Sequence, residues 1–155
     1  MKSVVGSTRV RVALLGVPTD VNSSFRRGPA EAPARIREIL QSDVGNAATE
    51  SGAELGHEIE LIDAGDVEIR EDATGGERIS ARVSALASPS GSAIPSAATR
   101  DGIPRVPLVL GGDHSITYPV VRALAAIHGP LQILHVDAHS DLYDDFAGNP
   151  HSHAS

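Results

Sequence analysis

The sequence predicts an α/β fold in which a mostly parallel sheet is covered by helices on both faces. Segments with strand character alternate with segments with helix character along the 155 residues. The strand segments are apolar at almost every position, as expected of strands that are buried on both faces. Hydrophobic residues make up 41% of the chain, which is enough for one globular core. The predicted arrangement therefore has three layers, α/β/α.

Four segments have the composition of buried strands. They are residues 10–17 (VRVALLGV), 58–62 (EIELI), 106–110 (VPLVL) and 131–136 (LQILHV). Aliphatic side chains dominate each segment, and a proline, glycine or aspartate follows each one directly. Because parallel strands end at the same edge of a sheet, the loops that follow them are expected to lie close together.

Three helices are predicted between these strands. The first covers residues 31–40 and contains Pro33, which a helix tolerates in its first turn. The second covers residues 77–86. The third is expected to begin at Thr117, acting as the cap, and to end at Gly129.

One further segment, residues 88–105, has no periodicity. It consists mainly of small residues and proline, and it is predicted to be a flexible loop within a single domain. Neither flank is large enough to form a separate domain, so the segment is not expected to be a domain linker.

The composition excludes several classes of function. The net charge is -7 and aromatic residues make up 3% of the chain, so no nucleic-acid partner is expected. No apolar run is long enough to span a bilayer, so no membrane partner is expected either. The chain has no cysteine, which excludes disulfides, thiolate metal sites and a cysteine nucleophile. The absence of cysteine fits a cytoplasmic location.

Potential metal ligands follow two of the predicted strands. Asp137, His139 and Asp141 form the motif DAHSD directly after residues 131–136, and alternate residues of an extended chain point to the same side. His114 follows residues 106–110 in the motif GGDHS, whose glycines allow the backbone to turn sharply. Oxygen and nitrogen donors without thiolates suit manganese, iron or zinc. These four residues are therefore candidate metal ligands at one edge of the sheet. The alternatives are a solvated DAHSD loop with a structural histidine and a packed or solvent-bonded His114.

Other histidines are assigned different roles. His153 lies in the loop NPHSHAS, where a histidine beside a metal can carry protons near neutral pH. The residues alone favour the alternative, a loop histidine without such a role. His135 lies within the fourth predicted strand, is expected to face away from Asp137, and is not a ligand candidate. At the end of the second strand, Asp63 and Asp66 are expected to be turn or capping residues.

The order and spacing of these motifs resemble those of the ureohydrolases, the family that includes arginase, agmatinase and formiminoglutamase. GGDHS at residues 111–115 and DAHSD at residues 137–141 carry the resemblance most specifically. GVPTD at residues 16–20 and DAGDV at residues 63–67 extend it over most of the chain, except residues 88–105. The resemblance implies an arginase-like fold. It also implies that residues 1–155 are the N-terminal part of one catalytic domain whose C-terminal part is missing.

The resemblance further implies a centre of two Mn²⁺ ions. His114 would bind the first ion and His139 the second. Asp137 would bridge the two ions, and Asp141 would complete the ligand shell of the first ion. A bridging hydroxide would attack a guanidinium carbon and release urea. His153 would transfer protons, although Ser-His-Ala stands here where the family usually has Ser-His-Gly. The family's second carboxylate pair, an Asp-x-Asp, has no counterpart in this sequence.

Several functions stay open at this point. The stretch 143–153 (YDDFAGNPHSH) is more similar to agmatinase, so the expected substrate is a guanidino compound without an amino-acid head. Arginase and formiminoglutamase activity are alternatives within the family. A related amide hydrolase with a single zinc ion, and an inactive truncated fragment that binds metal weakly, are alternatives outside it. The full-length protein is expected to form homo-oligomers.

Overall fold

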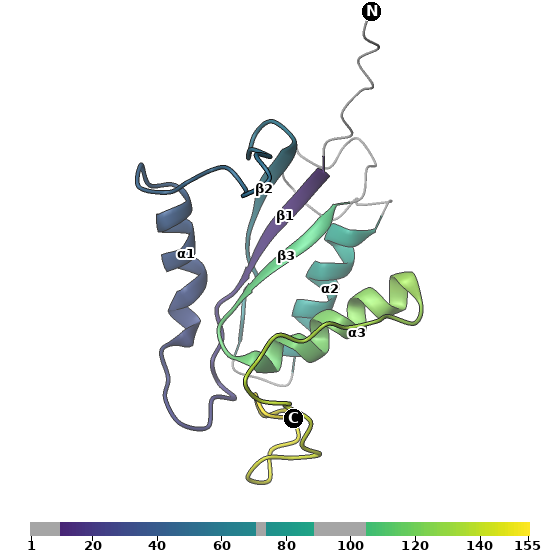
Figure 1. Ribbon diagram of the computed structural model, residues 1–155. Coiled ribbons are helices and arrows are strands. Elements are labelled where there is room, and N and C mark those ends of the chain that lie inside the picture. The colour runs from purple at the N-terminus through teal and green to yellow at the C-terminus, as the bar shows by residue number, and fades with distance from the viewer. Residues whose placement is uncertain (1–9, 71–73, 89–104) are drawn as a thin grey trace, which may run out of the picture.

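The molecule is a three-stranded sheet between two helical layers. The computed structural model describes residues 10–70, 74–88 and 105–155. Helix α1 covers one face of the sheet, and helices α2 and α3 cover the other (Figure 1). In chain order the elements are β1 (Val10–Val17), a 3-10 turn (Pro29–Glu31), α1 (Ala32–Leu40), β2 (Ile59–Asp66), α2 (Gly75–Ala87), β3 (Val106–Gly111), a second 3-10 turn (His114–Ile116) and α3 (Thr117–His128). This arrangement confirms the predicted three-layer α/β fold.

Strand β1 is the central strand of the sheet. The strand order is β2-β1-β3 and both pairings are parallel. Val12 pairs with Leu61 on one side and with Val106 on the other. Strand β2 runs to Asp66, four residues beyond its predicted end, because its ladder with β1 continues through a shift in register. The parallel pairing brings the carboxyl ends of all three strands to one edge.

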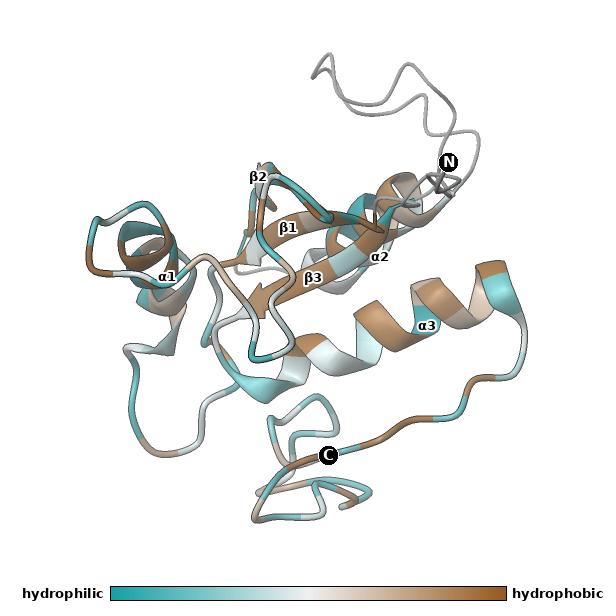
Figure 2. Ribbon diagram, turned by 45° about the horizontal axis from the view of Figure 1, so that its top comes forward, coloured by the Kyte–Doolittle hydropathy of each residue, from teal (hydrophilic) through white to brown (hydrophobic). Residues whose placement is uncertain are grey.

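The main core lies between the sheet and helices α2 and α3. Alternate residues of β1, namely Ala13, Leu15 and Val17, are fully buried there. They pack with a cluster of aliphatic side chains from the two helices and adjoining loops: Val67, Ile79, Val83, Leu86, Ile116 and Ala123. Strand β1 is coloured mostly as hydrophobic in Figure 2. Alternation along β1 thus divides its side chains between two helical layers.

The fourth predicted strand is not formed. Residues 131–136 have no regular secondary structure and are exposed throughout, with Leu134 at 89% and Val136 at 88%. The segment leaves the end of α3 as an extended, largely apolar chain (Figure 2). An apolar run indicates a need for burial, but a strand also requires a hydrogen-bonding partner. No ladder joins this segment to β3 within the described residues.

The helices confirm the other predictions with one correction. Helices α1 and α2 lie within two residues of their predicted bounds, and Pro33 is in the first turn of α1. Gly129 ends α3 with a φ of 79°. Thr117, however, is the first residue of α3 and makes no capping hydrogen bond. The capping side chain is that of Asp113, which accepts from the backbone N–H of Ser115 at the start of the preceding turn.

The predicted loop at 88–105 lies almost entirely outside the described residues. Only its two ends, Ser88 and Arg105, are described, and the prediction is therefore not tested.

Candidate metal centre

The loop after β3 is held closely against the loop after β1. The backbone N–H of Gly112 donates to the carbonyl of Val17 at 3.1 Å, and that of Asp113 donates to the carbonyl of Thr19 at 3.0 Å. A β-carbon at position 112 would lie 1.8 Å from the Thr19 carbonyl oxygen. Only glycine therefore permits this approach, as the GGDHS motif predicted.

Asp113 connects three segments of the site. Its carboxylate is buried, with the residue 7% exposed. It accepts from the backbone N–H groups of Ser115 and Asn22, each at 3.0 Å, and from the hydroxyl of Ser23 at 3.3 Å. The Asn22 side chain in turn donates to the hydroxyl of Ser115 at 3.2 Å. The neighbouring residue, His114, is thereby fixed at the sheet edge.

The ring of His114 is oriented from both sides. Its Nδ1 lies 3.3 Å from the hydroxyl of Thr117, and its Nε2 lies 3.8 Å from the carboxylate of Asp141. The ring also stacks on His135, with centroids 5.2 Å apart and planes 10° from parallel. The imidazoles of His114 and His135 and the carboxylate of Asp141 therefore lie close together.

This group of three consists of His114, His135 and Asp141. One ligand atom from each lies within 4.8 Å of the others. The expectation that His135 faces away from Asp137 is wrong, since its Nε2 lies 3.7 Å from the Asp137 carboxylate. Residues two apart in an extended chain point to the same side, and that spacing should have indicated this position.

Asp137 and His139 lie beside the group. Asp137 accepts from the backbone N–H of His139 at 2.8 Å, and this hydrogen bond, together with the nearby imidazoles, lowers the pKa of Asp137 below its ordinary value. The ring Nδ1 of His139 lies 3.4 Å from Asp137, but its side chain is 82% exposed. His139 is thus next to Asp137 without being part of the group of three, whereas Asp141 is 12% exposed and inside it.

The donor set fits a divalent metal ion. It offers imidazole nitrogen and carboxylate oxygen, the ligands that manganese, iron and zinc accept in proteins. An ion with bonds of about 2.1 Å draws its donors to within roughly 4.2 Å of one another. The side chains of His114 and His135 are each 36% exposed, so their rings have room for this contraction.

His153 is held by the loop after β1. Its Nε2 lies 2.7 Å from the hydroxyl of Ser24. Four residues earlier, the Asn149 side chain donates to the Asn22 side chain at 3.1 Å. The ring of Phe146 lies against His153, with centroids 6.2 Å apart. The hydroxyl contact therefore places His153 at the loop after β1.

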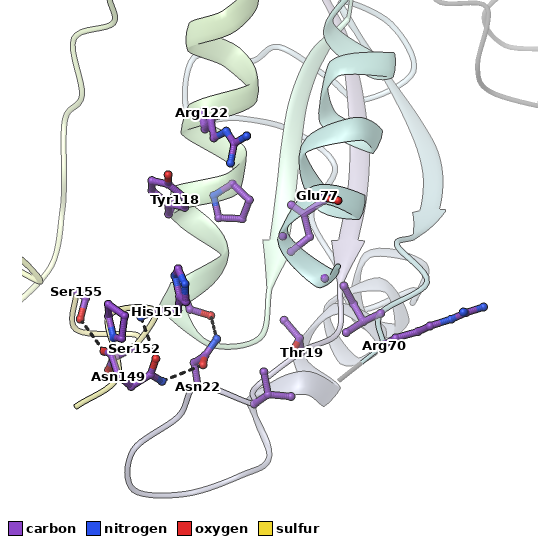
Figure 3. Close-up of a pocket in the computed structure, with 18 of the residues that line it drawn as sticks. Thr19, Asn22, Arg70, Glu77, Tyr118, Arg122, Asn149, His151, Ser152 and Ser155 are labelled. Atoms are coloured by element: carbon purple, nitrogen blue, oxygen red, sulfur yellow. Dashed lines mark hydrogen bonds between the residues drawn. The ribbon is translucent and has the colours of Figure 1, made fainter. Parts of the chain in front are cut away.

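A cavity of about 1130 Å³ lies beside these loops. It is lined by Asn22, Asn149 and His151 from the loops, Glu77 from α2, and Arg122 from α3 (Figure 3). Of the described residues, its lining includes neither the four predicted metal ligands nor His153. The cavity is therefore a neighbour of the candidate centre and not the centre itself.

A comparison with protein families decides the assignment. The family model described as "Arginase family" matches residues 10–155. The chain belongs to the arginase family. The match includes both motifs of the candidate centre, and it confirms the resemblance that GGDHS and DAHSD carry.

Relatives and solved structures agree with this assignment. The chain is 46% identical to arginase 1, mitochondrial, of Arabidopsis thaliana over 98% of its own length, and 36% identical to the mitochondrial agmatinase of Gallus gallus over 92%. The structure of the arginase from Medicago truncatula superposes with a TM-score of 0.77 at 41% identity, covering 97% of this chain and 46% of that one. The arginase-like fold is thus confirmed. The chain spans 43% of the Arabidopsis protein and 38% of the Gallus protein.

Sequence reasoning missed the part of the site that the loop after β1 contributes. Asn22 and Ser24 lie in a polar segment, and Asp113 was considered only as part of its motif. The sequence position of this loop indicates its place, because a loop at the carboxyl end of a central parallel strand lies beside the loops of the neighbouring strands.

None of the described helices is long and apolar enough to cross a membrane.

Proposed function

We propose that the complete protein is a metal-dependent hydrolase of guanidino C–N bonds that releases urea. The observation that carries the proposal is the convergence of the GGDHS and DAHSD loops, where His114 and Asp141 approach within 3.8 Å. Membership of the arginase family supports the same chemistry. A resident divalent ion would supply a water of lowered pKa and positive charge beside the substrate.

The ligands we propose are His114, Asp137, His139 and Asp141, with Mn²⁺ as the metal and two ions in the complete site. Two carboxylates offset part of the positive charge of such a centre, and Asp137 is suited to this because its pKa is lowered. His135 is available as a further nitrogen donor. His139 would have to turn its exposed side chain toward the group to take part.

His153 is the residue we propose for proton transfer. The reaction breaks a C–N bond, and the departing nitrogen must gain a proton before it leaves. Imidazole accepts and donates protons near neutral pH. The ring of His153 is held by Ser24 and Phe146, so it lies against the loop after β1 at the carboxyl edge of the sheet.

Two substrates are supported by different observations. The stretch 143–153 favours agmatine, whereas the 46% identity with a plant arginase, against 36% with an agmatinase, favours arginine. We place arginine first because that identity extends over nearly the whole chain, and agmatine second.

The decisive experiment measures urea release from arginine, agmatine and formiminoglutamate by the complete protein. The protein is stripped of metal and then reloaded with Mn²⁺ or Zn²⁺. We expect activity only after reloading, with Mn²⁺ more effective than Zn²⁺. Faster urea release from agmatine than from arginine would make agmatine the substrate, as residues 143–153 indicate. A protein that is active with one tightly bound Zn²⁺, and that releases no urea, would indicate an amide hydrolase instead.

Asp137→Ala tests the centre itself. Removing a carboxylate from between positive charges should lower urea release by at least about a hundredfold and weaken Mn²⁺ binding. Asp43→Ala is the control, since Asp43 is exposed on the loop after α1 and far along the chain from both motifs. Equal activity of the two variants would refute the assignment of Asp137.

The partners and location follow the same proposal. The partner is a small guanidino substrate, without nucleic acid or membrane, and the full-length protein is proposed to be a homo-oligomer. A cytoplasmic location stays a prediction; the names of the plant relatives place those proteins in mitochondria. Light scattering of the purified protein and fractionation of its native cells test these two points.

A further inference from the structure

The loop after β1 reaches the proposed proton-transfer residue through one side chain. Ser24 places its hydroxyl 2.7 Å from Nε2 of His153, which is a normal length for a strong hydrogen bond. The two residues are 129 positions apart in the sequence. The contact therefore depends on the fold of the whole molecule and not on local chain geometry.

Ser24 belongs to a loop that is itself firmly held. Its neighbours Asn22 and Ser23 donate to the buried carboxylate of Asp113 at 3.0 and 3.3 Å. Asp113 immediately precedes the metal candidate His114. One buried carboxylate thus fixes both the loop that carries Ser24 and the loop that carries His114.

The loop that carries His153 is attached to the same place. Asn149 donates to Asn22 at 3.1 Å, and Asn22 donates to Ser115 at 3.2 Å. This chain of side chains holds the backbone of the His153 loop. It does not determine the angle of the imidazole ring, for which the described polar contact is the one to Ser24.

We infer that Ser24 is a positioning residue for His153 and that it fixes the ring angle and the nitrogen available for proton transfer. With Nε2 engaged by the hydroxyl, Nδ1 is the nitrogen that exchanges the proton. A hydrogen bond on one ring nitrogen sets the tautomer of the other in this way. This inference rests on the proposed function, in which His153 transfers a proton to the departing nitrogen.

The test compares Ser24→Ala and Ser24→Thr in the complete, Mn²⁺-loaded protein, using the substrate that the wild type hydrolyses faster. Ser24→Ala should lower kcat by about tenfold, since one hydrogen bond to a group that becomes charged is lost. KM, Mn²⁺ affinity and Tm should stay at their wild-type values because Ser24 lies on a held loop. Ser24→Thr keeps a hydroxyl and should retain most of the activity.

A double-mutant cycle separates positioning from a general structural role. In a His153→Ala background, Ser24→Ala should cause no further loss, because the residue on which it acts is absent. The pH dependence of kcat should also shift in Ser24→Ala but not in Ser24→Thr.

The outcomes are distinct. An unchanged kcat in Ser24→Ala, or a loss that persists in the His153→Ala background, overturns the positioning role. An unchanged kcat in His153→Ala overturns the proton-transfer role in the proposed function instead. A loss of Mn²⁺ affinity in Ser24→Ala also overturns the inference, because it shows that the loop acts through the metal ligands.

Discussion

At the residue scale, Gly112 determines how closely the strand-end loops pack. The 1.8 Å approach that a β-carbon would make is to a backbone atom, the Thr19 carbonyl, which cannot rotate away as a side chain can. The two hydrogen bonds from residues 112 and 113 to the β1 end would have to lengthen together. The position of the neighbouring His114 depends on both.

We therefore expect Gly112→Ala to destabilise the protein by about 1–3 kcal/mol through overpacking. Urea denaturation measures this loss, and Mn²⁺ titration should show weaker binding. Gly76→Ala is the matched control, because its β-carbon would meet nothing closer than Pro119 at 3.9 Å. Inside α2, that change should stabilise the protein by up to about 1 kcal/mol. Equal effects of the two substitutions would contradict the packing argument.

Asp20 makes a pH-dependent contribution to stability. Its pKa lies below the usual 3.8, first because the backbone N–H of Gly28 donates to its carboxylate at 2.6 Å, and also because of Ala30 and Arg27. The residue is 7% exposed. A carboxyl with a lowered pKa in the folded state stabilises that state above its unfolded pKa, and the contribution is lost as the pH falls through the folded pKa.

Asp20→Asn should therefore be less stable than the wild type at pH 7. The difference in free energy of unfolding should shrink as the pH falls below the usual 3.8. Denaturation series at several pH values between neutral and acidic measure it. Asp43→Asn removes the same charge from an exposed position and serves as the control. A constant difference across the whole range would show that the carboxylate of Asp20 is not involved.

The sequence could identify most of the site residues but not their contacts. GGDHS follows β3 and so places His114 at the carboxyl edge of the sheet. DAHSD was expected to follow a fourth strand, which is not formed, yet its Asp141 lies 3.8 Å from His114. The hydrogen bonds of Asn22 and Ser24 join residues that are distant in sequence, and no local pattern specifies such pairs. The position of His135 was predictable, because residues two apart in an extended chain point to the same side. The expectation that His135 faces away from Asp137 applied this period wrongly.

At the scale of elements, Arg37 joins helix α1 to the end of β2. Its side chain is 14% exposed, and its guanidinium contacts Asp63 at 3.0 Å, Asp66 at 2.6 Å and the carbonyl of Gly65 at 3.0 Å. The side chain crosses Gly16, where a β-carbon would collide with Asp66 and Arg37. Asp63 accepts from the backbone N–H of Gly65 at 2.9 Å, as expected of a turn residue, and both Asp63 and Asp66 are also partners of this arginine.

Arg37→Ala should cost about 1–3 kcal/mol, because a mostly buried group with several charged hydrogen bonds is removed. Arg35→Ala on the same helix is the control. Arg35 is 67% exposed and pairs, among the described residues, with Glu38 and Glu31, so its loss should cost less than about 0.5 kcal/mol. Thermal or urea denaturation of both variants checks the prediction, and equal losses would contradict it.

Strand and helix positions were predictable to different degrees. Strand β1 matches its prediction from Val10 to Val17 because all its signals agree: apolar composition, a central place in the sheet and a proline after its end. Residues 131–136 carry the same composition without a partner in the described sheet. Apolar sequence predicts burial, and pairing is a property of two segments, so a single segment could not predict it.

At the scale of the whole molecule, the apolar segment after α3 is expected to affect whether the protein aggregates in solution. Ile133, Leu134 and Val136 are 65%, 89% and 88% exposed, and β3 is an edge strand of the described sheet. Exposed aliphatic runs and open sheet edges both promote association between molecules.

Residues 1–155 expressed as a separate polypeptide are therefore expected to aggregate and to bind Mn²⁺ only weakly, with little or no urea release. Weak binding follows because four or five donors cannot hold two divalent ions firmly. Light scattering, calorimetry and a urea assay measure the three properties. Leu134→Gln should reduce the aggregation without improving the metal affinity. Tight binding of two ions with turnover would show that these residues suffice.

The central position of β1 has a consequence for how the molecule is made. Asn22 and Asp113 lie 91 positions apart, and Ser24 and His153 lie 129 apart. A ribosome adding about 5–20 residues per second needs roughly 6–26 seconds to span the longer interval. During that time β1, whose last five residues are buried in the folded molecule, has emerged while its partner β3 and the His153 loop have not. Strand β1 is thus synthesised well before the segments that bury it, and Ser24 can meet His153 only after the longer interval.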